Sequence, residues 1–364
     1  MKILDKINPF KSTVVQTEFG TVTTLVTEVE ISEHGSINFE EKTLLANYVY
    51  TKDETHNLVY TLIDSEGKHE SFVEDDGILP TLFLSPENEV YVSLVPYHPD
   101  KELEISIPVF NRENTDLPKG NRPFVGKFVG TTKQFSIFYD VDIWSDTKPD
   151  KLLAIEFKNG AIKKKHNVKI SLPRNNKIFI LNNEIHLLAK DSNGWLHRQI
   201  DESGKTIHER LIQSNQKYFR QILSISFEKE SYILCEQKGK IIIEIISVNG
   251  KCESKELADI KDGFYNTWKP VKIADDTYIT QFNGEFGNGW FTIKNDHLLE
   301  LFYSKGERGY KNLLTDKVLR MNNENLVISS INKTMDNAYA IVFYPMTERG
   351  VKNKELIILN REIK

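Results

Sequence analysis

Basic residues recur just ahead of apolar, strand-like runs, at positions that a repeated fold could gather around one ligand. They are Arg122, Arg174, Arg220, Lys269 and Lys311, with Arg308 close to the last of them. An arginine can clamp a carboxylate or a phosphate through two parallel hydrogen bonds, and a lysine binds such groups as a point charge. The pattern is more typical of solvated loop charges; a basic cluster that binds a carboxylate or a phosphate is the alternative.

Aromatic residues are the second candidate for a binding function. Large amphipathic rings suit a recognition surface because they offer a wide contact area and a polar tip. The alternative is that these rings pack between sheets as core. The residues concerned are Trp144, Trp195, Trp268, Trp290 and Tyr310.

Acidic residues offer the third kind of chemistry. Asp140 and Asp142 alternate along an expected strand, and Asp76 stands in an expected loop. Close carboxylates can bind a cation such as Ca²⁺ or share acid and base roles, but hydrated strand ends have the same composition. No histidine pair has metal-ligand spacing, and HExxH, GxSxG, P-loop and CxxC motifs are absent from the sequence. We therefore expect no cofactor and no metal site, and assign no catalytic residue.

The elements that must position these residues read as strands throughout. The chain has 364 residues, of which 39% are hydrophobic and 27% charged, as in soluble globular proteins. Its apolar runs are short, rich in Ile, Val, Phe and Tyr, and bounded by Gly, Asn, Asp or Pro, without a sustained helical period. No run approaches the roughly 18 to 20 apolar residues that a membrane helix needs. The sequence predicts an all-β protein.

Two series of turns repeat along the chain. The first contains Gly, Asn or Asp at positions 67, 114, 160, 204, 250, 296 and 350, which are 47, 46, 44, 46, 46 and 54 residues apart. The second series lies about 25 residues upstream of each and includes Glu41-Lys42 and Asn182-Asn183. A unit of this length with two hairpins is four antiparallel strands, the size of one propeller blade.

Seven such units predict a single seven-bladed β-propeller of four-stranded antiparallel blades over residues 1–364. The N-terminal segment, 1–34, contains the alternating stretch Thr21–Ile31, which we expect to close the ring by pairing with the last blade. Two packed β-sandwich domains are the alternative. The expected blades cover about 35–73, 79–129, 134–165, 176–212, 220–257, 269–303 and 316–360.

Two of the turns, Asp64–Lys68 and Asp201–Lys205, have the form D-x-x-G-K. They look like the hairpins of many bacterial propellers, and the chain as a whole resembles the β-propeller superfamily. The signatures of WD40 repeats, kelch repeats and sialidase Asp boxes are missing. The resemblance therefore implies the fold and names no narrower family.

One end of such a ring carries the loops between blades and the loops between the second and third strands of each blade. All four tryptophans, Tyr310 and Arg220 fall at this end. The sequence thus predicts a non-enzymatic recognition module that binds a protein or peptide partner, or a small polar ligand, through this face. The alternative is a hydrolase or lyase that acts on a glycan or lactone at the channel mouth, with or without Ca²⁺.

Charge and cysteine content bear on the partners and the compartment. The net charge of −5 is wrong for a nucleic-acid binder. Cys235 and Cys252 fall on strands expected to be too far apart for a disulfide, so we expect two free thiols and a cytoplasmic location. We also expect a monomer that has no nucleic-acid or membrane partner.

Overall fold

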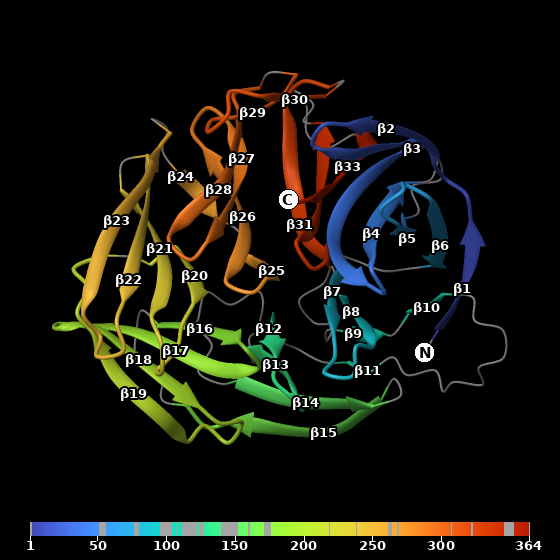
Figure 1. The fold of residues 1–364 in the computed structure, drawn as a ribbon. Helices are drawn as coiled ribbons and strands as arrows, with labels where there is room; N and C mark the ends of the chain where they lie inside the picture. The colour runs from blue at the N-terminus through green and yellow to red at the C-terminus, as the bar shows by residue number, and fades with distance from the viewer. Residues whose placement is uncertain are drawn as a thin grey trace.

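A computed structural model gives the fold of the chain. It describes residues 2–50, 56–75, 80–94, 104–106, 108–110, 122–123, 127–139, 152–158, 161–170, 176–217, 219–237, 239–260, 264–267, 269–306, 308–321, 323–345 and 353–363. Its strands form six hydrogen-bonded sheets that stand around a common centre (Figure 1). The protein is an all-β β-propeller. Seven four-stranded blades were expected, but the described strands form six sheets, of which one has ten strands and one has seven.

Four of the sheets have the expected composition of four antiparallel strands. In sheet order their strands are β11 (Arg122–Pro123), β9 (Glu104–Ser106), β8 (Val90–Leu94) and β7 (Pro80–Leu84); β12 (Lys127–Thr131), β13 (Ser136–Tyr139), β14 (Leu152–Lys158) and β15 (Ala161–Val168); β16 (Asn176–Leu181), β17 (Glu184–Asp191), β18 (Gly194–Ile200) and β19 (Thr206–Ile212); and β20 (Gln221–Ser224), β21 (Ser231–Gln237), β22 (Lys240–Ile246) and β23 (Cys252–Asp259). The expected boundary at 129 is wrong, because β12 starts the next sheet at Lys127.

A fifth sheet has seven strands because a hairpin extends its outer edge. Strands β24 and β25 both pair with β26, and β29 and β30 follow β28. The expected start of the last blade at 316 is therefore wrong, since 318–320 belongs to this hairpin. The strands are β24 (Phe264–Thr267), β25 (Val271–Ala274), β26 (Thr277–Gly284), β27 (Asn288–Lys294), β28 (His297–Ser304), β29 (Gly309–Asn312) and β30 (Val318–Arg320).

The sixth sheet joins the two ends of the described chain. Its central strand, β3, is 20 residues long (Gly20–Phe39). The segment Thr21–Val26 pairs with β33, as expected for Thr21–Ile31, and Ile31–Phe39 pairs with β4. One strand thus pairs with strands from both ends of the described chain and joins them in one sheet. The other strands are β1 (Lys2–Ile7), β2 (Lys11–Thr17), β4 (Lys42–Tyr50), β5 (His56–Ile63), β6 (His69–Asp75), β10 (Pro108–Phe110), β31 (Leu326–Met335), β32 (Ala338–Pro345) and β33 (Asn353–Glu362).

Local turn chemistry explains why the repeat is regular. Asn182 and Asn183 have φ values of 51° and 64°, the left-handed pair that a two-residue hairpin turn requires. In the other series, Asp201 Oδ1 accepts hydrogen bonds from the backbone N–H groups of Ser203 and Lys205, each at 2.9 Å. Gly204 has a φ of 90°, and a Cβ there would lie 2.0 Å from the backbone oxygen of Lys169. Only glycine fits this turn.

The core lies between neighbouring sheets. One cluster joins Ile137 of β13 to Ile185 of β17, and another joins Leu188 of β17 to Ile233 of β21. Inner strands of neighbouring sheets also contact each other, among them β3 with β7, β12 with β16, and β25 with β31. Each sheet therefore buries its faces against its neighbours, which a lone sheet cannot do.

A buried ion pair fixes the region where the chain closes on itself. Arg361 of β33 donates from Nε to both carboxylate oxygens of Glu300 on β28, at 3.0 and 3.1 Å, and from Nη1 to the backbone oxygen of Phe19 at 2.7 Å. The side chains of Arg361 and Glu300 are only 13% and 10% exposed. The guanidinium also lies 5.3 Å from the ring centroid of Phe19. This single side chain connects two sheets and the turn before β3.

Two buried histidines pack between the sheets of β16–β19 and β20–β23. His186 Nδ1 lies 3.1 Å from His197 Nε2, and the two rings are sandwiched between Phe179 and Phe227. Burial, and next to it the charge of Arg210, lowers the pKa of His186 to about 4. Burial likewise lowers the pKa of His197. Both imidazoles therefore stay neutral in the folded protein near pH 7, although Glu184 Oε2 lies 3.5 Å from His186 Nε2.

Replacing Arg361 should destabilise the fold strongly. We expect Arg361→Ala to lower the free energy of unfolding by about 3–5 kcal/mol, because it leaves the Glu300 carboxylate buried without its partner. The exposed pair Arg198–Glu209 supplies the control, and Arg198→Ala should cost no more than about 1 kcal/mol. Urea unfolding curves measure both values. Equal losses in the two variants would show that the closure does not depend on this contact.

The histidine pair should make the protein sensitive to mild acid. Unfolding releases both imidazoles to their ordinary pKa of 6.5, so the free energy of unfolding falls as the pH drops from 6.5 towards about 4. For His186 alone the loss at pH 4 is on the order of 3 kcal/mol. The urea midpoint should depend less steeply on pH in the double variant His186→Gln, His197→Gln than in the wild type. Replacing the exposed His208 by Gln should leave the dependence as in the wild type; an unchanged slope in the double variant would refute the prediction.

Candidate functional site

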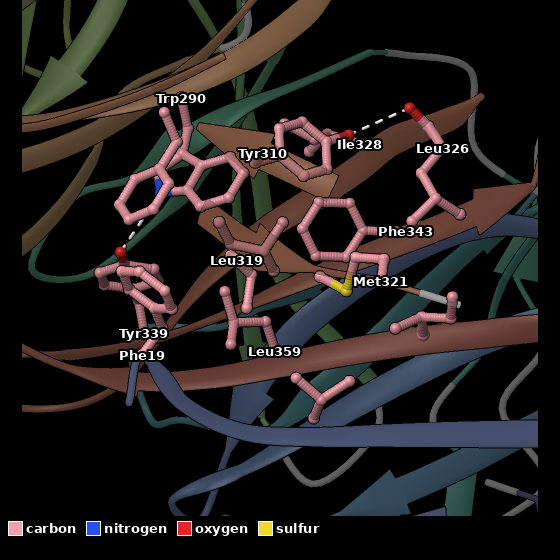
Figure 2. Packing of buried hydrophobic residues seen from close by; sticks show 14 of the residues in the cluster. Phe19, Trp290, Tyr310, Leu319, Met321, Leu326, Ile328, Tyr339, Phe343 and Leu359 are labelled. Atoms are coloured by element: carbon pink, nitrogen blue, oxygen red, sulfur yellow. Dashed lines mark hydrogen bonds between the residues drawn. The ribbon is translucent and has the colours of Figure 1, made fainter. Parts of the chain in front are cut away.

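The aromatic residues expected on a recognition face are buried wherever the structure describes them. Trp290, Tyr310 and Trp195 are 0%, 1% and 4% exposed. Trp290 Nε1 donates to the Tyr339 hydroxyl at 3.3 Å, and the Tyr310 hydroxyl donates to the backbone oxygen of Leu326 at 3.0 Å (Figure 2). Trp195 stacks on Phe219 and donates from Nε1 to a backbone oxygen. These three rings belong to the core, the alternative that the sequence left open.

Several other predicted residues lie outside the part of the chain that the structure describes. These are Trp144, Trp268, Asp76, Asp140, Asp142 and Arg174. Arg122 lies on β11, but its side chain is not among those described.

The recurring basic residues do not all meet at one place. Lys311 lies on β29, at the outer part of its sheet, and pairs with Asp316 at 2.6 Å. Arg308 is exposed and pairs with Glu324 at 2.8 Å. Both were expected near the channel entrance because the sequence placed the last repeat ten residues too early. Arg220 and Lys269, in contrast, do line the centre of the ring.

The centre of the ring contains a cavity of about 560 Å³. Its walls are the inner strands of four successive repeats, β12, β16, β20 and β25 (Figure 1). Among the described residues its charged side chains are all cations, and the uncharged polar ones include Thr131, Asn182, Gln221 and Ser224. The cations are Lys177, Arg220, Lys269 and Lys272.

Two of these cations point their ammonium groups at backbone oxygens. Lys269 Nζ donates to the Val129 oxygen on β12 at 3.2 Å, so its side chain connects the sheet of β25 to the sheet of β12. Lys177 Nζ donates to the backbone oxygens of Phe219 and Arg220, the latter at 3.2 Å. Within the described chain neither lysine forms an ion pair with a carboxylate. Lys272 differs, since it lies 3.4 Å from Asp275 at an exposed turn.

The surroundings disfavour the charge on both lysines. Burial lowers the pKa of Lys177, and the neighbouring Arg220 lowers it further. Burial also lowers the pKa of Lys269, whose side chain keeps contact with solvent while protein atoms surround it, as expected inside a channel. Ammonium groups held this way gain from an anion placed beside them. The arrangement can therefore bind a carboxylate or a phosphate.

Lys177 is a member of this site that the sequence analysis missed. It is the second residue of β16, and the residue singled out there was Arg174, three positions earlier. The available signal was a lysine directly before the apolar run 178–181 of an inner strand.

Other expectations concern cysteines, metals and membranes. Cys235 and Cys252 are both free thiols, as expected. Among the described residues, no three His, Cys, Asp or Glu side chains lie close enough together to hold a metal ion. No helix in the described part of the chain has the length and apolar character needed to span a membrane. The cytoplasmic location and the monomeric state stay predictions.

Known proteins resemble this chain in fold alone. No family model matches the sequence, and no curated protein is significantly similar to it. The β-propeller domain of the Trilobed protease from Pyrococcus furiosus is 9% identical over 92% of this chain and 98% of its own, with a TM-score of 0.52. A streptogramin B lyase is 12% identical over 97% and 98%, with a TM-score of 0.47. The WD40 domain of SCAP from fission yeast is 11% identical over 97% and 98%, with a TM-score of 0.41. At 9% identity, the similarity to the Trilobed protease domain supports the β-propeller fold and establishes no activity.

Proposed function

We propose that this propeller is a non-enzymatic recognition module, and that it binds an anionic group of a protein, peptide or small polar partner in its central channel. The observation that carries the proposal is the charge of the cavity wall. Each of its charged side chains among the described residues is a cation, and two of them, Lys177 and Lys269, donate only to backbone oxygens. The binding face proposed here is thus the mouth of the channel, where Arg220 lies, and not the tryptophans.

Electrostatics favours an anion at this position. A cation that has lost part of its water without gaining a counter-charge raises the energy of the folded protein. A carboxylate or phosphate between Lys177, Arg220 and Lys269 would offset this cost and accept charge-assisted hydrogen bonds. The net charge of −5 does not oppose this, because a cleft focuses the field of the charges that line it.

The alternative was a hydrolase or lyase on a glycan or lactone. The carboxylates expected for that activity, Asp76 and Asp142, lie outside the described residues. The described wall of the cavity contributes lysines, an arginine, amides and hydroxyls. These groups suit binding of an anion, and no described feature favours the alternative.

We further propose that the ring counts seven four-stranded blades, two of which share β3. In support, Thr21–Val26 forms a four-stranded antiparallel set with β33, β32 and β31. Ile31–Phe39 forms another with β4, β5 and β6. Each set has the composition of the four-stranded sheets elsewhere in the ring.

Removing one cation should weaken binding of simple anions. We expect Arg220→Gln to raise the dissociation constant for inorganic phosphate or acetate at least about fivefold, which corresponds to about 1 kcal/mol, because a charge-assisted hydrogen bond is lost. Calorimetric titrations of the full chain at low ionic strength, with chloride as the reference anion, measure the change.

Arg308→Gln is the matched control, since Arg308 is an exposed arginine paired with Glu324 outside the channel wall. It should bind both anions like the wild type. The proposed function fails if the wild type binds neither anion, or if Arg220→Gln and Arg308→Gln have the same effect.

A further inference from the structure

A second cavity, of about 780 Å³, adjoins the cationic one. Its walls come from β3, β7, β26 and β31, together with Pro270 and Val271 (Figure 1). Among the described residues only Lys269 and Pro270 line both cavities. Lys269, which reaches across to the Val129 oxygen, therefore marks the boundary between them.

The two cavities differ in charge. Lys269 is the single charged residue among the described walls of the second cavity. Much of the remaining wall is aliphatic and includes Leu82, Val271, Val327 and Ile331. An ionic group gains nothing in such a space, whereas an apolar group of a ligand leaves water on entering it.

Several polar side chains of this second wall are already hydrogen-bonded within the protein. Ser36 Oγ donates to Ser330 Oγ and accepts from Asn332 Nδ2, and Gln281 Nε2 donates to the Ile328 oxygen. Asn283 Oδ1 has no hydrogen-bond partner among the described residues, but it is fully buried and therefore not open to a ligand in the cavity.

We infer that the ligand joins a carboxylate to an uncharged apolar body, with the carboxylate beside Lys269 in the cationic cavity and the body in the second cavity. This inference rests on the proposed function, and it names the ligand class for the same channel. A carboxylate and an apolar side chain occur together in the last residue of a peptide chain that ends in an apolar amino acid. We assign the channel to such a chain end; a free N-acyl amino acid has the same chemistry.

Three small probes separate the contribution of the carboxylate to binding from that of the apolar body. N-acetylglycine carries the carboxylate and the amide, N-acetyl-leucine adds an apolar side chain, and N-acetyl-leucinamide lacks the charge. Calorimetry on the full chain should show N-acetyl-leucine binding at least about tenfold more tightly than N-acetylglycine, as expected for burial of a leucine side chain. N-acetyl-leucinamide should bind at least about tenfold more weakly than N-acetyl-leucine.

A hexapeptide that ends in leucine distinguishes the two sources of the ligand. It should bind at least as tightly as N-acetyl-leucine when its last carboxylate is free, and should lose binding when that group is amidated. Binding of N-acetyl-leucine without binding of the peptide would overturn the assignment to a chain end in favour of a small acid.

A variant that fills the second cavity tests the location of the body. Ser329 lines this cavity on β31, and Ser329→Phe should reduce N-acetyl-leucine to the affinity of N-acetylglycine while N-acetylglycine stays within about twofold. Ser329→Leu serves the same purpose if the larger side chain prevents folding. Ser65→Phe, on the exposed Asp64–Lys68 turn, is the matched control and should change neither probe.

The outcomes separate this inference from the function on which it rests. Equal affinities for N-acetylglycine and N-acetyl-leucine in the wild type would overturn the two-cavity ligand and leave the anion site intact. Unchanged binding of N-acetyl-leucine to Ser329→Phe would also overturn the two-cavity ligand and leave the anion site intact. Failure of phosphate, acetate and all three probes to bind would instead overturn the proposed function.

Discussion

The structure depends on the need of each sheet to bury both of its faces. A four-stranded sheet has too little apolar surface on one face alone to form a stable unit, so every sheet needs a neighbour on each side. A ring meets this need only when it is closed. In this chain β3 provides the closure through its pairing with β33 and β4, and Arg361 connects β33, β28 and the turn at Phe19. The apolar packing between sheets therefore depends on this junction.

The closed ring also creates the site. Inner strands from different repeats converge at the centre, so residues far apart in the sequence come into contact, as Lys269 and Val129 do. A rigid scaffold of this kind can tolerate a local cost, here two lysines whose charge is disfavoured by burial. The same scaffold places a cavity with several aliphatic side chains directly beside the cationic one. That juxtaposition is the basis of the proposed amphipathic ligand.

Much of the fold could be predicted because its repeat is encoded in local turn chemistry. The left-handed Asn182 and Asn183, and the Asp201 carboxylate that accepts from its own turn, are decided by residues next to one another. Tertiary contacts were harder to predict from the sequence. Trp290 packs against Phe302 and Phe343, and a tyrosine 49 residues away accepts its N–H; nothing in the local sequence reports these partners. The sequence pattern did not reveal that β3 pairs with strands from both ends of the described chain. Strand β29 lies between the two expected blades 269–303 and 316–360, and β30 lies within the second of them. For the site, Arg220 and Lys269 were foreseen from their position ahead of strands, whereas Lys177 lies within one.

The pairing of β3 with β33 has a consequence for how the protein is made. Residues 21–26 are synthesised more than 300 residues before their partners, 355–360. Until then one edge of β3 has no strand to pair with, and an open edge invites association with other nascent chains. The adjacent β2, which pairs with the opposite edge of the same segment, can form at once because only a short turn separates the two strands. This hairpin covers one edge of the segment Thr21–Val26 before β33 is made.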